Sequence, residues 1–406
     1  MSKSAAARWF IAPLALLMLA SATAVGAESQ PSGKSPYRPA DPLNNSAFDH
    51  FYNMDFDRSV EEFRRVADRY PDDPFAANHL LTAELFRELN RMGALNSADY
   101  SSNNFITSPH RIADPQAKER IKYLVTRALW LEQKQLQANP KDVDALYARG
   151  VTRGQFAIYT ALIEHAWISA LRNAVGARRD HEKVLDLSPN YADAKLVVGA
   201  HNYVVGSLPW AVKVASSLVG ISGNKAKGLE YLREAAEGGG ETAVDARVVL
   251  VVFLRREHRS PEALDLSRHL VTAFPRSSLL KMEEANILRD QAKNQEAATI
   301  YREIWQAGHA GRYPGQRYQA AATALGDLLR GEKNYAGAAA AYELVTQDAQ
   351  ADPELQQKAS LAAGQMYDLL QNRGLAVKKY QQVIALNSDN ASADSARKFL
   401  KSAYRQ

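Results

Sequence analysis

A three-residue pattern recurs along the chain and constrains its fold more than any other feature. A small residue is followed four positions later by an aromatic residue, and three positions after that by a branched aliphatic residue. The pattern occurs as Ser59/Phe63/Val66, Ala297/Tyr301/Ile304, Ala338/Tyr342/Val345 and Ala376/Tyr380/Val383. Offsets of four and three residues place all three side chains on one face of an α-helix. We therefore expect helices that bury the same kind of face at four places in the chain.

Each of the last three of these helices is preceded by another small residue, twelve positions before the first residue of the triplet. Ala285, Gly326 and Gly364 occupy this position, which predicts an earlier helix that packs closely against the aromatic side chain. Proline cannot continue a helix, so it marks the turn between one pair of helices and the next. Such prolines are Pro71, Pro140, Pro189 and Pro275, and Gly150 and Gly199 each follow one of them by ten residues.

This spacing resembles the tetratricopeptide repeat, a helix–turn–helix unit of 34 residues. The resemblance covers nearly all of the chain after its first 45 residues and implies an all-α fold, a right-handed α-solenoid of about eight helical hairpins. In this register the units begin near residues 40, 74, 143, 192, 244, 278, 319 and 357. The longer intervals predict insertions in units two to four, near 91–114, 155–175 and 204–227. We expect the insertion at 155–175 to lengthen both helices of its hairpin.

The chain divides into four parts on this reading. Residues 1–27 have the features of a signal peptide, with Lys3 and Arg8 before an apolar core and Val25-Gly26-Ala27 as a cleavage site. Residues 28–45 are rich in Pro, Ser and Asn and are predicted to be a flexible lead-in. The repeats occupy 46–390, and 391–406 is predicted to be a capping helix with a polar outer face. We expect export to the periplasm or the medium, and the absence of cysteine excludes a lipoprotein.

Composition and motifs exclude several classes of function. Without Lys3 and Arg8 the chain carries 48 basic and 45 acidic residues, and no basic run indicates nucleic-acid binding. The nine histidines show no metal-ligand spacing, and Ser222 lacks the second glycine of a nucleophile elbow. His165 beside Glu164 has no nucleophile near it in the sequence. We therefore predict a protein that is not an enzyme, with no cofactor and no metal.

A stack of such hairpins presents a groove that is lined by the first helix of each unit. Helical spacing predicts that Tyr147, Tyr203 and Asn286 face this groove. The same spacing places an arginine at position 12 of three successive units, namely Arg255, Arg289 and Arg330. These arginines would form a ladder that binds the carboxylates of an acidic segment. The alternative is that they are solvated and pair with the neighbouring Asp290 and Asp327.

The segment Val204–Leu229 is unusually apolar for a chain of this kind. Its sixteen residues before Gly220 include Pro209 and Lys213, so the run is too short and too interrupted for a membrane span. We expect a short helix, Pro209–Val219, that buries its Trp210 side. An apolar patch or ligand pocket is predicted from four aromatic residues: Phe156, Tyr159, Trp167 and Trp210.

The same segment resembles part of a eukaryotic tetratricopeptide-repeat family, the tetratricopeptide repeat protein 39 type, which is linked to inclusion-body clearance. The match consists of Leu208-Pro209, the apolar run that follows, Gly220-Ile221-Ser222-Gly223 and Gly228-Leu229, with Ile221 in place of an aromatic residue. It covers about forty residues and implies a helical scaffold.

Taken together, these patterns predict an exported repeat scaffold that binds a protein or peptide partner, such as an acidic segment, in the cell envelope. They exclude a transmembrane span in the mature chain and allow a homo-oligomer. The alternative is a periplasmic binding protein for an apolar or acidic small ligand, which would act with a transporter.

Overall fold

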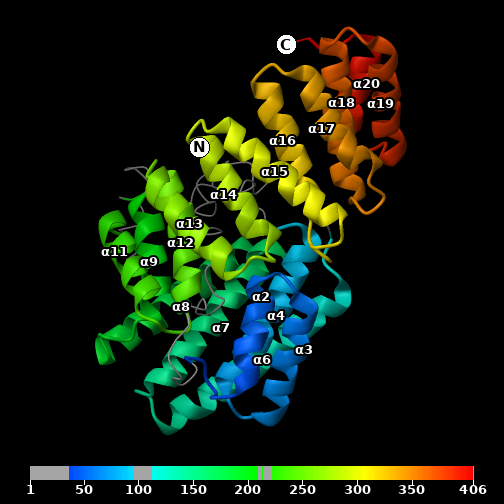
Figure 1. The fold of residues 1–406 in the computed structure, drawn as a ribbon. Helices are drawn as coiled ribbons and strands as arrows, with labels where there is room; N and C mark the ends of the chain where they lie inside the picture. Colours follow the sequence, from blue (N-terminus) through cyan, green and yellow to red (C-terminus); the bar gives the residue numbers. More distant parts are fainter. Residues whose placement is uncertain (1–35, 96–111, 209–212, 214–221, 406) are drawn as a thin grey trace. The chain divides into compact units, whose positions relative to one another are not determined.

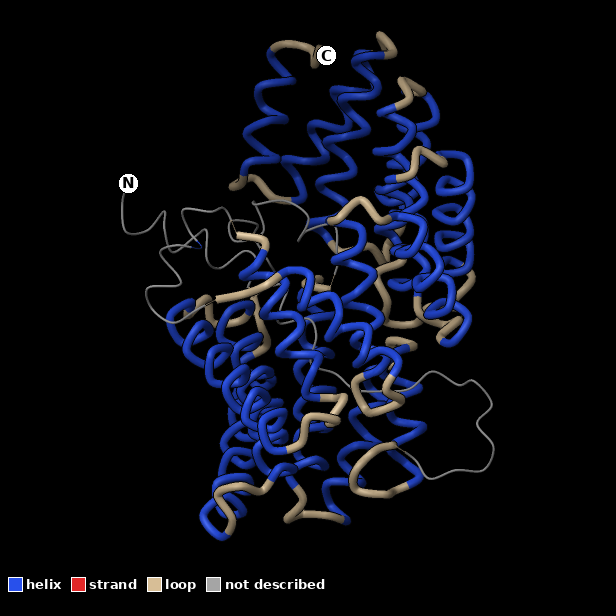
Figure 2. Tube along the Cα trace, turned by 90° about the vertical axis from the view of Figure 1, so that its left-hand side faces the viewer, coloured by secondary structure: helices blue, strands red, loops and turns tan. Residues whose placement is uncertain are grey.

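The computed structural model describes residues 36–95, 112–208, 213 and 222–405. These residues form 17 α-helices and no strand (Figures 1 and 2). The predicted all-α repeat fold is therefore confirmed. The chain divides into two compact units, residues 1–274 and 275–406, and each is described by itself.

In unit 1 consecutive helices pair as five hairpins. The pairs are α2 (Pro42–Tyr52) with α3 (Phe56–Arg69), α4 (Pro74–Met92) with α6 (Pro115–Ala138), α7 (Val143–Leu162) with α8 (Trp167–Leu187), α9 (Ala194–Gly206) with α11 (Lys225–Glu237), and α12 (Ala243–Arg256) with α13 (Ser260–Ala273). Helices α7 and α8 have 20 and 21 residues, and the insertion expected at 155–175 stays a prediction.

Unit 2 contains three hairpins and a final helix. The pairs are α14 (Ser278–Asp290) with α15 (Asn294–His309), α16 (Gln319–Gly331) with α17 (Tyr335–Gln347), and α18 (Pro353–Leu369) with α19 (Arg373–Leu386), and α20 (Ala391–Lys401) follows them. Helix α20 buries Ala393 and Ala396, and the ring of its Phe399 lies 5.5 Å from that of Tyr380. Its role as a capping helix stays a prediction.

An Asp-Pro pair begins four of the helices. At α4, the side chain of Asp73 accepts hydrogen bonds from the amides of Phe75 and Ala76. Pro74 has no amide proton, so it leaves no hydrogen-bond donor unsatisfied in the first turn. Asp41, Asp114 and Asp352 cap α2, α6 and α18 in the same way. Aspartate at the cap and proline at the first helical position both favour helix initiation, so these starting points are local properties of the sequence.

The residues of the recurring triplet are buried in the four hairpins that contain them. All twelve of them have at most 1% of their surface exposed. At Gly326 and Gly364 a Cβ atom would lie 2.5 and 2.6 Å from the rings of Tyr342 and Tyr380, respectively. The small residue upstream therefore makes room for the aromatic ring downstream, as the spacing predicts.

One expectation differs from the structure, and three others lie wholly or partly outside its described part. Residues 36–45 belong to the predicted flexible lead-in, yet Tyr37 and Asp41 are buried and α2 begins at Pro42. These residues pack because Tyr37 lies on the ring of Phe48, with 4.2 Å between the ring centroids. The expected signal segment and, apart from Lys213, the expected helix at 209–219 lie outside the described residues. Part of the segment that resembles the type 39 family, residues 209–212 and 214–221, also lies outside the described residues, and that resemblance is untested.

Candidate binding surface on the first helices of the repeats

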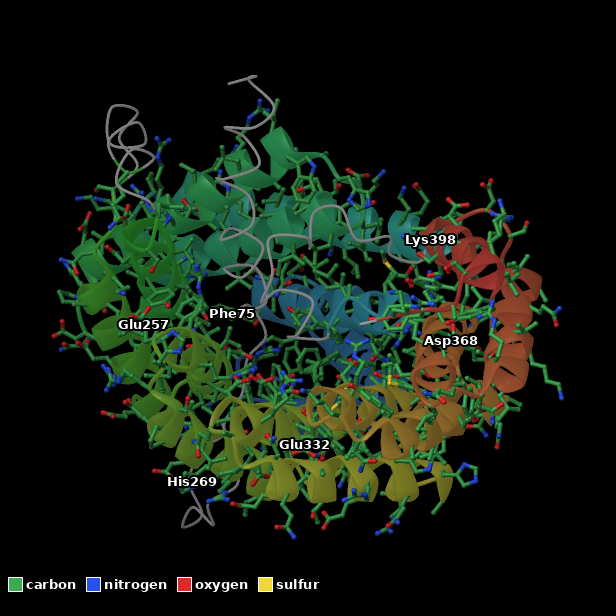
Figure 3. All side chains as sticks on the ribbon, turned by 90° about the horizontal axis from the view of Figure 1, so that it is seen from above. Phe75, Glu257, His269, Glu332, Asp368 and Lys398 are labelled. Atoms are coloured by element: carbon green, nitrogen blue, oxygen red, sulfur yellow. The ribbon has the colours of Figure 1, made fainter. Side chains whose placement is uncertain are left out.

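The second helix of each hairpin in unit 2 donates a tyrosine hydroxyl to a polar side chain on the first helix. The acceptors are Asn286 for Tyr301, Asp327 for Tyr342 and Asp368 for Tyr380, at 2.8, 2.7 and 2.8 Å (Figure 3 labels Asp368). Asn286 is consequently only 3% exposed. This residue, which the sequence assigns to the groove, thus has a structural partner inside its own hairpin.

The three arginines of the predicted ladder lie in the last turns of α12, α14 and α16. Arg289 lies 3.8 Å from Asp290 and Arg330 lies 3.6 Å from Asp327, and both arginine side chains are about one-third or more exposed. These are the neighbours expected in the alternative reading. Arg255 belongs to unit 1 and the other two belong to unit 2, so the ladder itself stays a prediction.

The predicted aromatic residues are mostly buried within unit 1. Tyr203 stacks on Phe253 with 3.8 Å between ring centroids, and its hydroxyl donates to Glu257 (labelled in Figure 3). Phe156 stacks on Tyr159, which is fully buried and whose hydroxyl donates to Glu164. The Tyr203–Phe253 stack thus joins α9 to α12, whereas the Phe156–Tyr159 stack lies within α7.

Two of the predicted aromatic residues, Trp167 and Trp210, differ from these. Trp167, at the start of α8, is partly exposed. Trp210 lies outside the described residues, so the predicted apolar patch is incomplete in the structure.

Around Tyr147 the structure contains a site that sequence reasoning missed. The segment Tyr37–Pro39 lies across the N-terminal turns of several first helices, and the side chain of Arg38 inserts between them. We define the arginine slot as the five residues that contact this side chain or its amide: Phe75, Asp144, Tyr147, Tyr191 and Glu241. They come from α4, α7, the turn before α9 and the turn before α12.

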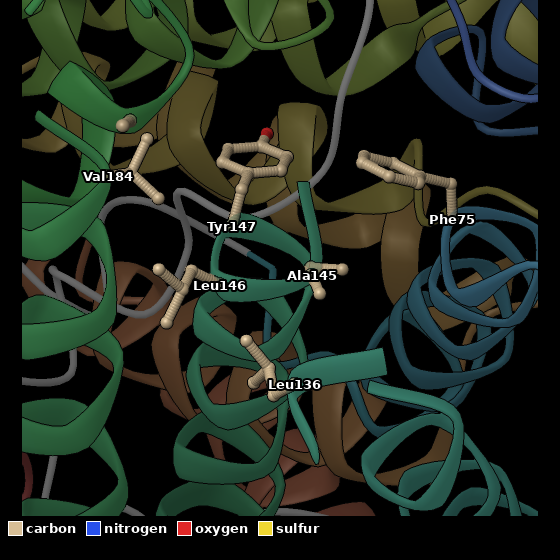
Figure 4. Packing of buried hydrophobic residues seen from close by; sticks show 8 residues of the cluster. Phe75, Leu136, Ala145, Leu146, Tyr147 and Val184 are labelled. Atoms are coloured by element: carbon tan, nitrogen blue, oxygen red, sulfur yellow. The ribbon is translucent and has the colours of Figure 1, made fainter. Parts of the chain in front are cut away.

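The contacts to Arg38 are of three kinds. Its guanidinium carbon lies 3.9 Å from the centroid of the Phe75 ring, and the ring of Tyr147 lies beside that of Phe75 (Figure 4). Its two terminal nitrogens donate to Asp144 and to the Tyr191 hydroxyl. Its backbone amide donates to Glu241 Oε1 at 2.8 Å. The slot therefore holds both a planar cation and the backbone amide of the residue that carries it.

Burial and neighbouring acidic groups have opposite effects on the pKa of Arg38. Burial alone would lower the pKa of Arg38, but Glu241, Tyr191 and Asp144 outweigh it and raise that pKa. Burial raises the pKa of Asp193 and, much more strongly, that of Asp245. Arg38 thus neutralises carboxylates that would be costly to bury alone.

Two buried polar groups at the slot have no hydrogen-bond partner among the described residues. These are the imidazole of His79, with both ring nitrogens, and the hydroxyl of Tyr147. The two side chains are 3% and 1% exposed, and His79 Nε2 lies 3.8 Å from Glu241 Oε2. The segment that fills the slot leaves this hydrogen-bonding capacity unused.

The composition of the helix ends explains why the slot could not be found in the sequence. Acidic residues such as Asp144 are expected near helix N-termini in any case, because they interact favourably with the helix dipole. The only local signal is the Tyr-Arg-Pro sequence of residues 37–39, which lies in a segment whose composition predicts a linker.

Other chemistry is not assembled in the described part of the chain. Glu164 accepts hydrogen bonds from Lys122 and Tyr159, whereas His165 is exposed. The residues that the structure describes include no group of three potential metal ligands. No described helix is both long and apolar enough to cross a membrane.

The sequence matches no protein-family model and no curated protein. Among solved structures, the chain is similar to one in the APC/C hetero-tetramer Cut9–Hcn1, with 14% identity and a TM-score of 0.47 over 89% of this chain. It spans 55% of the length of that chain.

Two further similar structures are described in their names as tetratricopeptide-repeat proteins. YrrB, "a TPR protein with an unusual peptide-binding site", has 15% identity and a TM-score of 0.30 over 66% of this chain and 97% of its own. A protein from Parabacteroides merdae has 14% identity and a TM-score of 0.32 over 78% of this chain and 97% of its own. The buried triplets recur along the chain, once in unit 1 and three times in unit 2. The described residues thus form an all-α repeat protein built of helical hairpins.

Proposed function

We propose that this protein is an exported, non-enzymatic repeat scaffold that binds a protein or peptide partner in the cell envelope. One observation supports this function more than any other: the first helices of unit 1 already hold a non-helical peptide segment, Tyr37–Pro39, through its side chains and its main chain. A surface that binds one such segment of the chain itself has the groups needed to bind another.

The export part of the proposal rests on the sequence of residues 1–27 and has its own test. Cleavage after Ala27 would give a mature protein that begins at Glu28. N-terminal sequencing of the protein purified from its own cells, after separation of envelope and cytoplasmic fractions, checks this. A protein that retains its first residues and stays in the cytoplasm would contradict export and leave peptide binding open.

The preference for an acidic partner rests on the three arginines at the ends of α12, α14 and α16. Changing Arg255, Arg289 and Arg330 together to Glu reverses six units of charge and should abolish capture of an acidic partner from envelope extract. A matched control changes three exposed arginines on second helices, Arg58, Arg65 and Arg302, to Glu. Equal capture by both variants would rule out the ladder. Retention of a small molecule instead of any protein would favour the ligand-binding alternative.

A further inference from the structure

We propose that the arginine slot is a binding site for an arginine within a peptide segment of the partner, and that Tyr37–Pro39 is an exchangeable occupant that this segment displaces. The inference rests on the proposed function and makes it more specific, because it assigns the partner a cationic rather than an acidic contact in unit 1.

The chemistry of the slot selects a guanidinium group. The flat face of Arg38 lies on the ring of Phe75, while its forked nitrogens reach Asp144 and Tyr191 at the same time. A planar, delocalised cation can stack and donate in two directions at once, whereas the ammonium group of lysine acts as a point charge. The partner residue is therefore an arginine, and lysine is a poor substitute.

The slot also contacts the main chain of the bound segment. Glu241, which is 1% exposed, accepts the amide of Arg38, and the side-chain amide of Asn44 donates to the carbonyl of Pro39 at 2.7 Å. Neither contact depends on which side chain the bound segment carries. An aromatic residue before the arginine would take the place of Tyr37 against Phe48.

The occupant seen in the structure leaves the site incompletely satisfied. The buried His79 imidazole and the Tyr147 hydroxyl have no hydrogen-bond partner among the described residues while Tyr37–Pro39 is bound. Leaving buried polar groups unpaired is costly, so a segment that also reached these two groups would bind more tightly. This difference gives a partner the means to displace a segment that is tethered in place.

The chain can release this segment without unfolding a helix. Asp41 caps α2 through the amide of Leu43 and pairs with Arg69 at 3.0 Å, so the start of α2 is held independently of Arg38. Residues 36–40 precede this anchor. Their departure would break the contacts in the slot and leave the hairpin of α2 and α3 in place.

The test uses the full chain with Arg38→Ala and a fluorescent peptide with the sequence of residues 34–41, KSPYRPAD. We expect saturable binding to the variant and at least tenfold weaker binding to the wild type, whose slot is filled. A peptide with lysine in place of arginine should bind the variant at least tenfold more weakly. Adding Asp144→Asn to Arg38→Ala should abolish binding, whereas adding Asp57→Asn, which alters a carboxylate with a 90% exposed side chain, should not.

A second measurement covers the case in which Arg38→Ala does not fold. Hydrogen exchange of the wild type should show the Arg38 amide exchanging much faster than the amides in the middle of α4 and α7. Exchange of that amide only through global unfolding would overturn the proposal, as would a folded Arg38→Ala variant that binds no peptide. Either result would leave the scaffold function intact if envelope partners are still captured. Peptide binding without any captured partner would instead contradict the scaffold function alone.

Discussion

At the scale of single residues, the hydroxyl of Thr152 decides the ionisation state of a buried carboxyl group. Thr152 Oγ1 lies 2.5 Å from Glu132 Oε1 and 2.6 Å from Asn78 Oδ1, yet a hydroxyl has one proton to donate. The side-chain amide of Asn78 already donates to the Ala148 carbonyl, so its oxygen must accept. Glu132 therefore carries a proton and donates it to Thr152. Burial raises the pKa of Glu132 to about 8, which agrees with this assignment.

The raised pKa of Glu132 predicts that the free energy of unfolding falls as pH rises. Unfolded Glu132 loses its proton near its ordinary pKa of 4.5, whereas the folded chain keeps the proton until about pH 8. The folded state binds more protons between these values, so its free energy of unfolding decreases with pH across that window. Glu132→Gln should flatten this part of the curve of Tm against pH. Glu119→Gln, at an exposed position of the same helix, is the control, and equal slopes in the two variants would refute the assignment.

At the scale of the element, the packing of the α16–α17 hairpin depends on the absence of a side chain at Gly326. Gly326 of α16 faces Tyr342 of α17, whose hydroxyl is fixed by Asp327, so the ring has little freedom to move. This contact lies between residues only sixteen positions apart, and its spacing is visible in the sequence. The same holds for Gly364 and Tyr380. The hairpins are therefore the part of the fold that the sequence predicts best.

Gly326→Ala should destabilise unit 2 by about 1–3 kcal/mol, since the added methyl group overpacks the hairpin. At Gly331, the last residue of the same helix, an added Cβ atom would meet no other atom within 4 Å. Gly331→Ala should be neutral or stabilise by up to about 1 kcal/mol, because alanine restricts the unfolded chain. Urea unfolding of both variants measures the difference. A similar midpoint for both would show that the tyrosine ring can yield.

At the scale of the whole molecule, the chain separates into two compact units, and the second of these contains several hairpins and a final helix. Unit 2 consists of three hairpins and α20, whose outer face is polar and whose inner face packs on α19. Repeat arrays are stabilised by contacts between neighbouring units and require a capping element. Three repeats with such a cap are sufficient for an independent fold.

Residues 275–406 expressed alone should therefore fold as a helical unit with a cooperative thermal transition. A fragment that ends at residue 387 lacks α20 and exposes the ring of Tyr380, so it should melt at lower temperature and aggregate more. Circular dichroism and light scattering of the two fragments check this. A non-cooperative transition in the longer fragment would show that unit 2 depends on the residues before Pro275.

The sequence by itself determined the helical hairpin, its register and the starting points of most units, because small residues, aromatic residues and Asp-Pro caps act over a few turns of helix. It could not determine what Tyr147 and Asn286 contact, because their partners lie on other helices. Only the tertiary structure brought Arg38 to Phe75, Asp144 and Glu241, and its amide and Glu241 are 203 positions apart. Such a contact has no period in the sequence. It exists because successive first helices of unit 1 bring their N-terminal turns around one cationic side chain.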